Sequence, residues 1–227
     1  MVKADHISFR TKGSHAPGDP SARQIPGGLK RRYLTIKRGV DLLCSLLVIG
    51  GILSWLLPLM AIAIKLDSRG PVFFLQRRIG RRGKVFTCFK LRTMVVNKHA
   101  DDRPSSGNDE RITTVGRFLR VTHLDELPQF LNVFFGSMSL VGPRPYMLTD
   151  HHRFSLLVPG HSFRNFVKPG LTGLSQVKGF HNTEIDFQTI FSRYQWDSFY
   201  VRNASLTLDM RILSRTMNIF FTQKTGI

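Results

Sequence analysis

Several widespread signatures of binding and catalysis are missing from this sequence. It contains no G-x-x-x-x-G-K-[S/T] phosphate-binding loop, no G-x-G-x-x-G dinucleotide motif, no G-x-S-x-G turn, and no H-E-x-x-H or C-x-x-C metal motif. These absences exclude the protein classes that the motifs define. Cys44 and Cys88 are its only cysteines, which is too few for a disulfide scaffold or a four-cysteine zinc site. Two thiols without partners are typical of a protein that faces a reducing cytosol.

Acidic residues are also scarce. The 227 residues include 15 Asp and Glu against 33 Lys and Arg, which gives a formal net charge of +18. Such a surplus predicts an anionic partner, either nucleic acid, an acidic membrane surface or a phosphorylated substrate. A mean hydropathy of −0.08 argues against a polytopic membrane protein, and a hydrophobic content of 42% excludes wholesale disorder. The length suits one domain, or one domain with an appendage.

The N-terminal part of the chain contains a polar stretch followed by a long segment that lacks charged residues. Residues 1–29 have no apolar periodicity and predict a disordered basic tail without a signal peptide. The uncharged run from Leu42 to Ile64 follows. As a helix it would be about 35 Å long, close to the hydrocarbon core of a bilayer at about 30 Å. An ordinary membrane-spanning helix is one interpretation of this run.

Two features of the run favour a re-entrant helix instead. Basic residues flank both of its ends, and a spanning helix would leave one basic block outside the cell, against the positive-inside rule. Pro58 lacks an N–H and is expected to bend the helix, with the Ser54 hydroxyl one turn earlier helping to satisfy freed backbone groups. We therefore predict that residues 30–67 form a Pro-kinked membrane helix-hairpin that enters and leaves by the same face.

The remainder, residues 68–227, predicts a cytoplasmic catalytic domain with interfacial helices. A short apolar run and an alternating run flank Gly80 and Gly83, which predicts a β-hairpin. Helical periodicity extends from Val115 to Phe135 with a break near Thr122, and a last helix is expected from Ser205 to Phe221. The fold class is therefore α+β, mainly helical, with a short β-hairpin and an N-terminal membrane helix.

The most informative acidic residues are the adjacent Asp125 and Glu126. Thr122 is a good N-cap three residues before Asp125, which predicts that both acids lie in the first turn of a helix. The positive helix end would favour their ionised forms, so Asp125 can attack phosphorus or hold a divalent cation. Plain helix capping is the alternative.

Basic residues surround this acidic pair along the chain. Arg144 lies between two prolines, which restrict the backbone and would preorganise a phosphate contact. An exposed basic loop is the alternative. Acids beside many phosphate-binding cations favour metal-assisted phosphoryl transfer. The candidate cations are Lys90, Arg92, Arg111, Arg117, Arg120 and Arg144.

Two other functions are weighed against an enzyme. A nucleic-acid-binding protein needs a basic stripe with stacking aromatic residues, and the paired acids would repel phosphate unless a metal intervened. An inactive scaffold has no need for the paired acids. Both considerations favour an enzyme and argue against nucleic acid as the partner.

Six segments together resemble the bacterial sugar transferases, the membrane-embedded phosphoglycosyl transferases that start glycan assembly. The resemblance extends from about Lys37 to Thr216 and includes the Pro-broken apolar segment. The matching segments are KRGVD at 37–41, GPVFFLQRRIG at 70–80, FKLRTM at 89–94, DERITTVGRFLR at 109–120, LDELPQFLNVFFGSMSLVGPRP at 124–145 and KPGLTG at 168–173.

The resemblance implies transfer of sugar-1-phosphate from a UDP-sugar to undecaprenyl phosphate, giving polyprenyl-diphosphate sugar and UMP through a covalent aspartyl intermediate. It implies that Asp125 is the nucleophile and a ligand of the cofactor Mg²⁺, with Glu126 beside it. The implied substrate-binding residues are Lys90, Arg92, Arg117, Arg120, Arg144 and Gln176.

The resemblance also implies a monotopic protein on the cytoplasmic face of the bacterial inner membrane, in contact with membrane lipids. A homodimer stays open. The chain departs from the family at Leu174 and Ser175, where many relatives carry a tryptophan, and this affects donor recognition rather than the chemistry. The sugar and the glycan pathway are left open.

Overall fold

The computed structural model describes residues 30–96, 109–180 and 186–222. The predicted tail 1–29 lies outside these residues. The described chain starts with helix α1 (Arg31–Val48), which passes through a π-helical turn (Ile49–Leu53) into helix α2 (Ser54–Asp67). Together they form an apolar helical stretch, Arg31–Asp67, that is long enough to cross a membrane, and only 11% of its most apolar window is buried within the protein.

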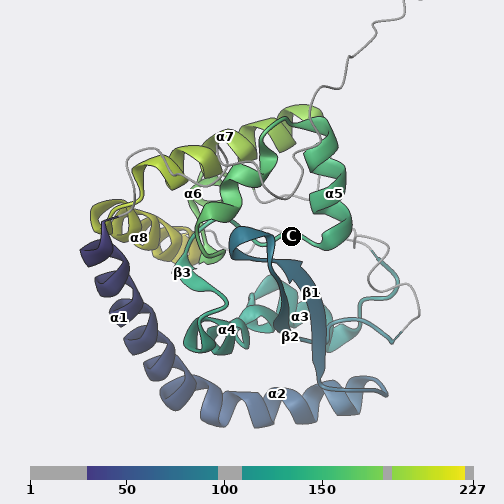
Figure 1. Ribbon diagram of the computed structural model, residues 1–227. Helices are drawn as coiled ribbons and strands as arrows, with labels where there is room; N and C mark the ends of the chain where they lie inside the picture. The colour runs from purple at the N-terminus through teal and green to yellow at the C-terminus, as the bar shows by residue number, and fades with distance from the viewer. Residues whose placement is uncertain (1–29, 97–108, 181–185, 223–227) are drawn as a thin grey trace, which may run out of the picture.

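The helical stretch bends at the π-helical turn rather than at Pro58, where the sequence predicted the bend. Figure 1 shows α1 and α2 leaving this turn in different directions. Pro58 lies inside α2, one turn later. The Ser54 hydroxyl donates to the Gly50 carbonyl at 2.6 Å, and the Trp55 ring N–H donates to the Gly51 carbonyl at 2.7 Å. The Ser54 hydroxyl therefore satisfies a carbonyl of the π-helical turn rather than the Ser54 carbonyl that Pro58 leaves without its usual N–H partner.

A β-hairpin forms where the sequence predicted one. Strand β1 (Phe73–Ile79) pairs antiparallel with strand β2 (Val85–Leu91), and the register places Gln76 opposite Cys88. A short 3₁₀ turn, η3 (Arg81–Gly83), joins them, and positive φ angles at Arg82 and Gly83 reverse the chain. Figure 1 shows the hairpin at the centre of the molecule, with α2 on one side of it and α5 (Leu148–Leu157) and α7 (Phe187–Asn203) on the other.

The predicted periodic segment 115–135 is broken into three pieces, as expected. They are α3 (Thr114–Val121), the 3₁₀ turn η4 (Leu124–Glu126) and α4 (Gln129–Phe135). The expected N-cap at Thr122 is wrong. Thr122 ends α3, and its hydroxyl donates to the Phe118 carbonyl at 2.7 Å, so it is used by the preceding helix rather than the following one.

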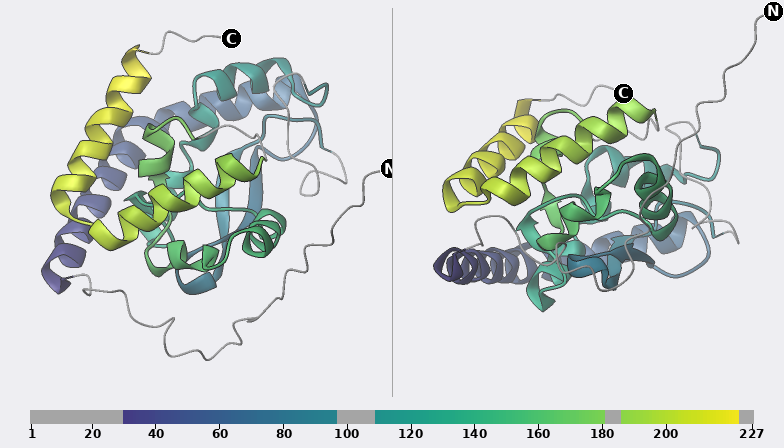
Figure 2. Two further views of the ribbon diagram at one scale, coloured as in Figure 1. Left: turned by 90° about the horizontal axis from the view of Figure 1, so that it is seen from above. Right: turned by 45° about the horizontal axis from the view of Figure 1, so that its top comes forward.

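The C-terminal part wraps the hairpin with short elements and two long helices. Strand β3 (Ser139–Val141) and strand β4 (Gly170–Thr172) form a parallel pair that the sequence did not predict. The expected last helix is confirmed as α8 (Leu206–Thr222), and Figure 2 shows it beside α7, with the N-terminal end of α1 below it. The remaining elements are α5 (Leu148–Leu157), η5 (His161–Phe166), α6 (Leu174–Val177), α7 (Phe187–Asn203) and α8 (Leu206–Thr222).

The main core joins the hairpin, α4, β3 and the C-terminal helices. Its fully buried members include Cys88, Val133, Met138, Tyr200 and Ile212. A second cluster packs Ile64 of α2 against Leu91 and Leu119, which fixes α2 under β2 and α3. The mainly helical α+β class with a short hairpin is therefore confirmed, while the re-entrant placement of α1 and α2 stays a prediction.

Candidate active site

Asp125 and Glu126 lie on a tight turn between two helices. His123 has a left-handed backbone, with φ of 56°, and this residue turns the chain from α3 into η4. Pro128 then immediately precedes α4. Because η4 is a single 3₁₀ turn, the two carboxylates are placed by this chain reversal rather than by the first turn of a long helix. Asp125 is 8% exposed.

The Glu126 carboxylate joins two cations from distant parts of the chain. Its Oε1 accepts a hydrogen bond from Lys90 Nζ at 2.7 Å and one from Arg144 Nη2 at 3.0 Å. Burial acts to raise the pKa of Glu126, but Arg144 and Lys90 outweigh it and hold this pKa well below its usual value. Glu126 in turn raises the pKa of Arg144. The predicted residues Lys90, Glu126 and Arg144 therefore form one charged cluster, with Lys90 from β2 and Arg144 from the loop after β3.

Asp125 lies beside this cluster in a different electrostatic setting. Burial raises its pKa, and Glu126 adds to the effect, while Lys90, Arg120 and His123 oppose it. No hydrogen bond or ion pair occupies its side chain among the residues that the structure describes. Two adjacent carboxylates thus have different roles, since one is neutralised by two cations and the other keeps its oxygens available.

The loop that carries Arg144 is held on both sides. Arg164 Nη2 donates to the Arg144 carbonyl at 2.8 Å, and Arg78 Nη1 donates to the Pro145 carbonyl at 2.6 Å. These bonds add to the restriction from the two flanking prolines. The preorganised loop that the sequence predicted is therefore fixed by two arginines that sequence reasoning missed.

Arg164 is itself anchored by a buried ion pair. Its Nε and Nη2 both donate to Asp197 Oδ2, at 3.0 and 2.6 Å, and the Ser175 hydroxyl donates to Asp197 Oδ1 at 2.8 Å. The Arg164 guanidinium also lies over the Tyr146 ring, 3.8 Å from its centroid. Ser175, where the sequence departs from the family that it resembles, therefore supports the arginine that holds the Arg144 loop.

Other predicted substrate-binding residues lie elsewhere. Arg92 is buried, and its guanidinium donates to the carbonyls of Arg69 and Ser68 at 2.7 and 2.6 Å, so it stabilises the C-terminal end of α2 instead of facing the cluster. Arg117 is exposed on α3. Gln176 lies in α6, and its amide donates to the Leu171 carbonyl at 3.5 Å.

Arg120 lies near Asp125, although its side chain is bonded to Thr93. Its Nε donates to the Thr93 hydroxyl at 2.8 Å, which fixes its side chain against β2 and the following segment. Burial lowers its pKa, and Asp125 is the leading opposing influence. Arg120 therefore lies within electrostatic reach of Asp125, as the sequence predicted for a cation near the acidic pair.

A small pocket opens beside the Arg144 loop. Its lining comes from the hairpin turn, the loop after β3, α5 and η5, and includes Gly80, Arg144, Tyr146, His151, Arg164 and Asn165. The pocket adjoins the cluster through Arg144, whose side chain bonds Glu126. The guanidinium of Arg144, a group suited to phosphate oxygens, thus borders both the pocket and the charged cluster.

Few side chains at this site could act as ligands of a metal ion. Within residues 30–96, 109–180 and 186–222, no group of three or more His, Cys, Asp or Glu side chains is placed to hold a metal ion. Asp125 is the carboxylate of the acidic pair that the neighbouring cations leave unbonded. One carboxylate together with substrate phosphate oxygens and water is a donor set that suits Mg²⁺.

Comparison with known proteins gives a consistent assignment. The chain is 40% identical to a UDP-glucose:undecaprenyl-phosphate glucose-1-phosphate transferase from Klebsiella pneumoniae, over 85% of this chain and 42% of that protein. It is 40% identical to an enzyme of the same name from Xanthomonas campestris, over 88% and 42%. It is 36% identical to an Aeromonas hydrophila UDP-N-acetylgalactosamine-undecaprenyl-phosphate N-acetylgalactosaminephosphotransferase, over 97% and 49%.

The chain thus spans less than half the length of these three relatives. A family model described as bacterial sugar transferase nevertheless matches residues 32–223, which is nearly the whole of this chain. The matched residues include the apolar helices, the hairpin and the charged cluster. The chain belongs to the bacterial sugar transferase family.

Proposed function

We propose that this protein transfers sugar-1-phosphate from a UDP-sugar to undecaprenyl phosphate. The observation that carries the proposal is the division of roles between Asp125 and Glu126. Lys90 and Arg144 neutralise Glu126, and the neighbouring Asp125 keeps an unbonded carboxylate beside the same cations. Such an arrangement suits a nucleophile that must approach a negatively charged diphosphate. The relatives named above act on UDP-sugars and undecaprenyl phosphate, which supports the same substrates here.

In the first step, a carboxylate oxygen of Asp125 attacks the phosphorus next to the sugar. A bond forms between this oxygen and phosphorus, the diphosphate P–O bond breaks, and UMP leaves with the electron pair. In the second step, a phosphate oxygen of undecaprenyl phosphate attacks the same phosphorus, and the Asp125 carboxylate leaves. Lys90, Arg120 and Arg144 balance the charge of the phosphate oxygens in both steps.

We also propose Mg²⁺ as the cofactor, held by Asp125 together with phosphate oxygens of the donor. When bound, the ion would withdraw charge from those oxygens and so lower the repulsion that an anionic nucleophile meets. Glu126 is a poorer ligand, because its negative charge is already balanced by Lys90 and Arg144.

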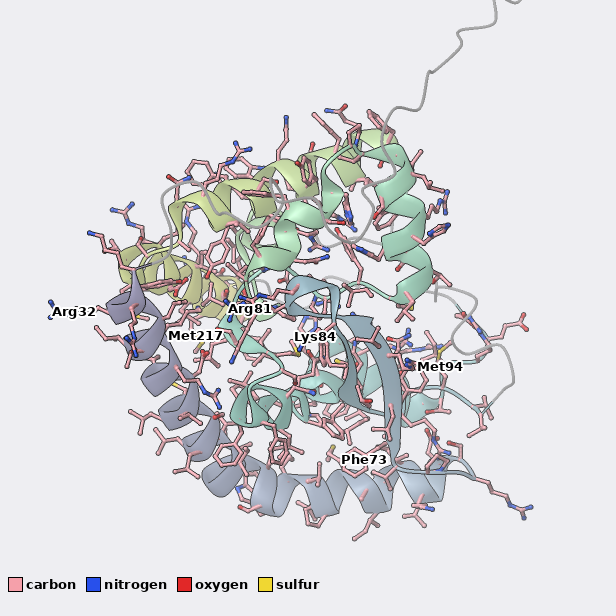
Figure 3. All side chains as sticks on the ribbon, in the orientation of Figure 1. Arg32, Phe73, Arg81, Lys84, Met94 and Met217 are labelled. Atoms are coloured by element: carbon pink, nitrogen blue, oxygen red, sulfur yellow. The ribbon has the colours of Figure 1, made fainter. Side chains whose placement is uncertain are left out.

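The proposed location is the cytoplasmic face of the inner membrane, with α1 and α2 as a re-entrant hairpin. Exposed apolar residues follow the outer side of both helices, including Leu43, Leu47, Trp55 and Ile62, which are 57–64% exposed. Basic residues at both ends of the stretch support entry and exit on the side of the anionic leaflet. Figure 3 shows one of them, Arg32, pointing away from the body of the protein.

A panel of UDP-sugars tests the proposal. Purified protein in detergent is given each UDP-sugar with Mg²⁺, with and without undecaprenyl phosphate. We expect UMP release and a lipid-linked product with at least one donor. Without the lipid, we expect a mass increment of one sugar phosphate on the intact protein. Absence of UMP release, of lipid product and of the mass increment with every donor would overturn the proposal.

A further inference from the structure

Lys168 is a cation without an obvious structural role. It lies in the loop before β4 and is partly buried. No hydrogen bond or ion pair holds its ammonium group within the part of the chain that the structure describes. Burial lowers its pKa, and Arg38, Arg81 and Lys37 lower it further, with Asp41 as the opposing charge. Three further cations on α1 and the hairpin turn are therefore within electrostatic reach of Lys168.

Gly136 is the point at which two of these cations meet. It ends α4 with a left-handed backbone, with φ of 83°. A Cβ at this position would lie 3.2 Å from Lys168 Nζ and 3.3 Å from Arg38 Nη2. Both charged groups therefore lie close to each other beside the bare backbone of one glycine.

Capping of α4 explains only one of the two cations. Arg38 donates from Nη1 to the Val133 carbonyl at 2.6 Å and from Nη2 to the Phe134 carbonyl at 2.7 Å. These bonds satisfy carbonyls at the end of the helix. Lys168 forms neither of these bonds. Its ammonium group therefore lies beside a like charge without a hydrogen bond that would offset the repulsion.

The surroundings of this pair indicate what kind of anion would occupy it. Phe135, the last residue of α4, is 71% exposed. Leu42 and Leu46 follow Arg38 by one and two turns on the same face of α1, and they are 37% and 57% exposed. Lysine and arginine that border an apolar surface are typical of residues at a membrane boundary, where their charged ends meet lipid headgroups.

We propose that Lys168 and Arg38 bind the phosphate of a membrane lipid at Gly136, with the lipid chain along Phe135 and the exposed leucines of α1. Arg81 lies at the edge of this site, at the turn of the hairpin in Figure 3. The shared chemistry is a lipid phosphate, which polyprenyl phosphate and anionic phospholipids both carry. Taking polyprenyl phosphate as one source rests on the proposed function.

The site adjoins the candidate active site through the main chain. A Cβ on Gly142 would lie 2.3 Å from the Lys168 carbonyl oxygen, so the two backbones are in direct contact. Gly142 is two residues before Arg144. The residue that would hold the lipid phosphate thus contacts, through its backbone, the loop that carries Arg144.

Native mass spectrometry of the full chain in neutral detergent tests the site. Decaprenyl phosphate, phosphatidylglycerol and phosphatidylcholine are added separately, and bound lipid is counted. We expect Lys168→Gln to weaken binding of at least one phosphate lipid about fivefold, the effect of about 1 kcal/mol per basic residue near a membrane. Lys168→Arg should retain binding. The matched control is Lys84→Gln, at the exposed end of the hairpin in Figure 3.

The lipid that is lost identifies the source. Loss confined to decaprenyl phosphate indicates a substrate site, and loss of phosphatidylglycerol binding indicates a site for anionic phospholipid. Unchanged binding of both in Lys168→Gln overturns the inference, as does an equal loss in Lys84→Gln. The measurement needs no turnover. If the wild type shows no transferase activity but Lys168→Gln still binds less lipid than the wild type, the proposed function is contradicted and the lipid site is not.

Discussion

The carboxylate of Asp41 on α1 accepts a hydrogen bond from the backbone N–H of Leu140 in β3 at 2.9 Å. The same oxygen accepts the Ser139 hydroxyl at 3.1 Å, and Asp41 is 3% exposed. One edge of β3 pairs with β4, and the Leu140 N–H points to the other edge. Asp41 is the hydrogen-bond partner of β3 at that second edge. β3 continues into the loop with Arg144, so one buried carboxylate joins the apolar helix to the charged cluster.

Replacement of this carboxylate is expected to destabilise the protein. In Asp41→Ala the Leu140 N–H and the Ser139 hydroxyl lose a buried acceptor, at a cost of about 1–3 kcal/mol. Asp41→Asn keeps a carbonyl oxygen and should lose less. Denaturant midpoints in detergent measure the effect. An Asp41→Ala protein as stable as wild type would show that α1 does not depend on this bond.

A second connection between the same elements involves Asp209 of α8. Its Oδ2 accepts from Lys37 Nζ at 2.8 Å and from the Tyr33 hydroxyl at 2.9 Å, both on α1. The Tyr200 hydroxyl lies 2.8 Å from Asp209 Oδ1 and 3.2 Å from the Val141 carbonyl of β3. Two polar networks, rather than apolar packing alone, thus position α1 against β3 and α8.

Asp125→Asn is the sharpest test of the proposed nucleophile. The amide has the shape of the carboxylate but cannot form the bond to phosphorus, so we expect turnover to fall by about four orders of magnitude or more with little change in stability. Intact-protein mass spectrometry should find no sugar phosphate on the variant. Asp186→Asn is the matched control, since Asp186 is an exposed N-cap of α7 and asparagine caps helices equally well. Normal turnover of Asp125→Asn would refute the assignment.

The sequence predicted elements whose signals are local. Turn glycines at 80 and 83 and helical periodicity after Ser205 specified the hairpin and α8 without reference to the rest of the chain. The β3–β4 pair could not be found in this way, because each strand has three residues and its partner lies about 30 residues away. The bend of the apolar helix moved from Pro58 to a π-helical turn, which has no simple sequence signal.

The same limit applies to the site. The acidic pair, the FKLRTM segment and the Pro-Arg-Pro segment supplied Glu126, Lys90 and Arg144 as candidates, but spacing could not tell which cations would face the acidic pair. Arg92, two residues after Lys90 on the same segment, instead bonds the carbonyls that end α2. Arg164 lies in no recognised motif, and Arg78 lies in the matching segment 70–80 but was assigned no role there. The role of both residues emerges only when the Arg144 loop is folded against them.

Glu126→Gln should change how stability depends on pH. The pKa of Glu126 is held below its usual value of 4.5, so its ionisation stabilises the folded protein fully above that value. This contribution is lost as the pH falls through the lowered pKa. The Gln variant lacks it and should be less stable at pH 7 by about 1–3 kcal/mol, with a weaker loss of stability in acid. Denaturant unfolding at several pH values measures both effects.

Glu110→Gln provides the control, since Glu110 is an exposed carboxylate on the same part of the chain. It should leave the stability at pH 7 and its acid dependence close to wild type. If Glu126→Gln behaved like Glu110→Gln, the bonds from Lys90 and Arg144 would contribute nothing to folding. Loss of activity without loss of stability would then assign Glu126 to substrate binding alone.

Lys90→Gln should shift the acid limb of the pH–rate profile of the first reaction step to higher pH. Asp125 must be ionised to attack, and Lys90 is the leading influence that lowers its pKa against burial. Removing this cation raises the pKa of Asp125, so the rate of phosphosugar formation should rise with pH over a higher range than in wild type. The plateau rate should also fall about tenfold to hundredfold, the effect of losing a charged hydrogen bond of about 1.5–3 kcal/mol. Single-turnover mass spectrometry between acidic and neutral pH measures both, with Lys178→Gln as the control at an exposed lysine. An acid limb that stays in place while the plateau falls would mean that Lys90 binds the donor without setting the charge of Asp125.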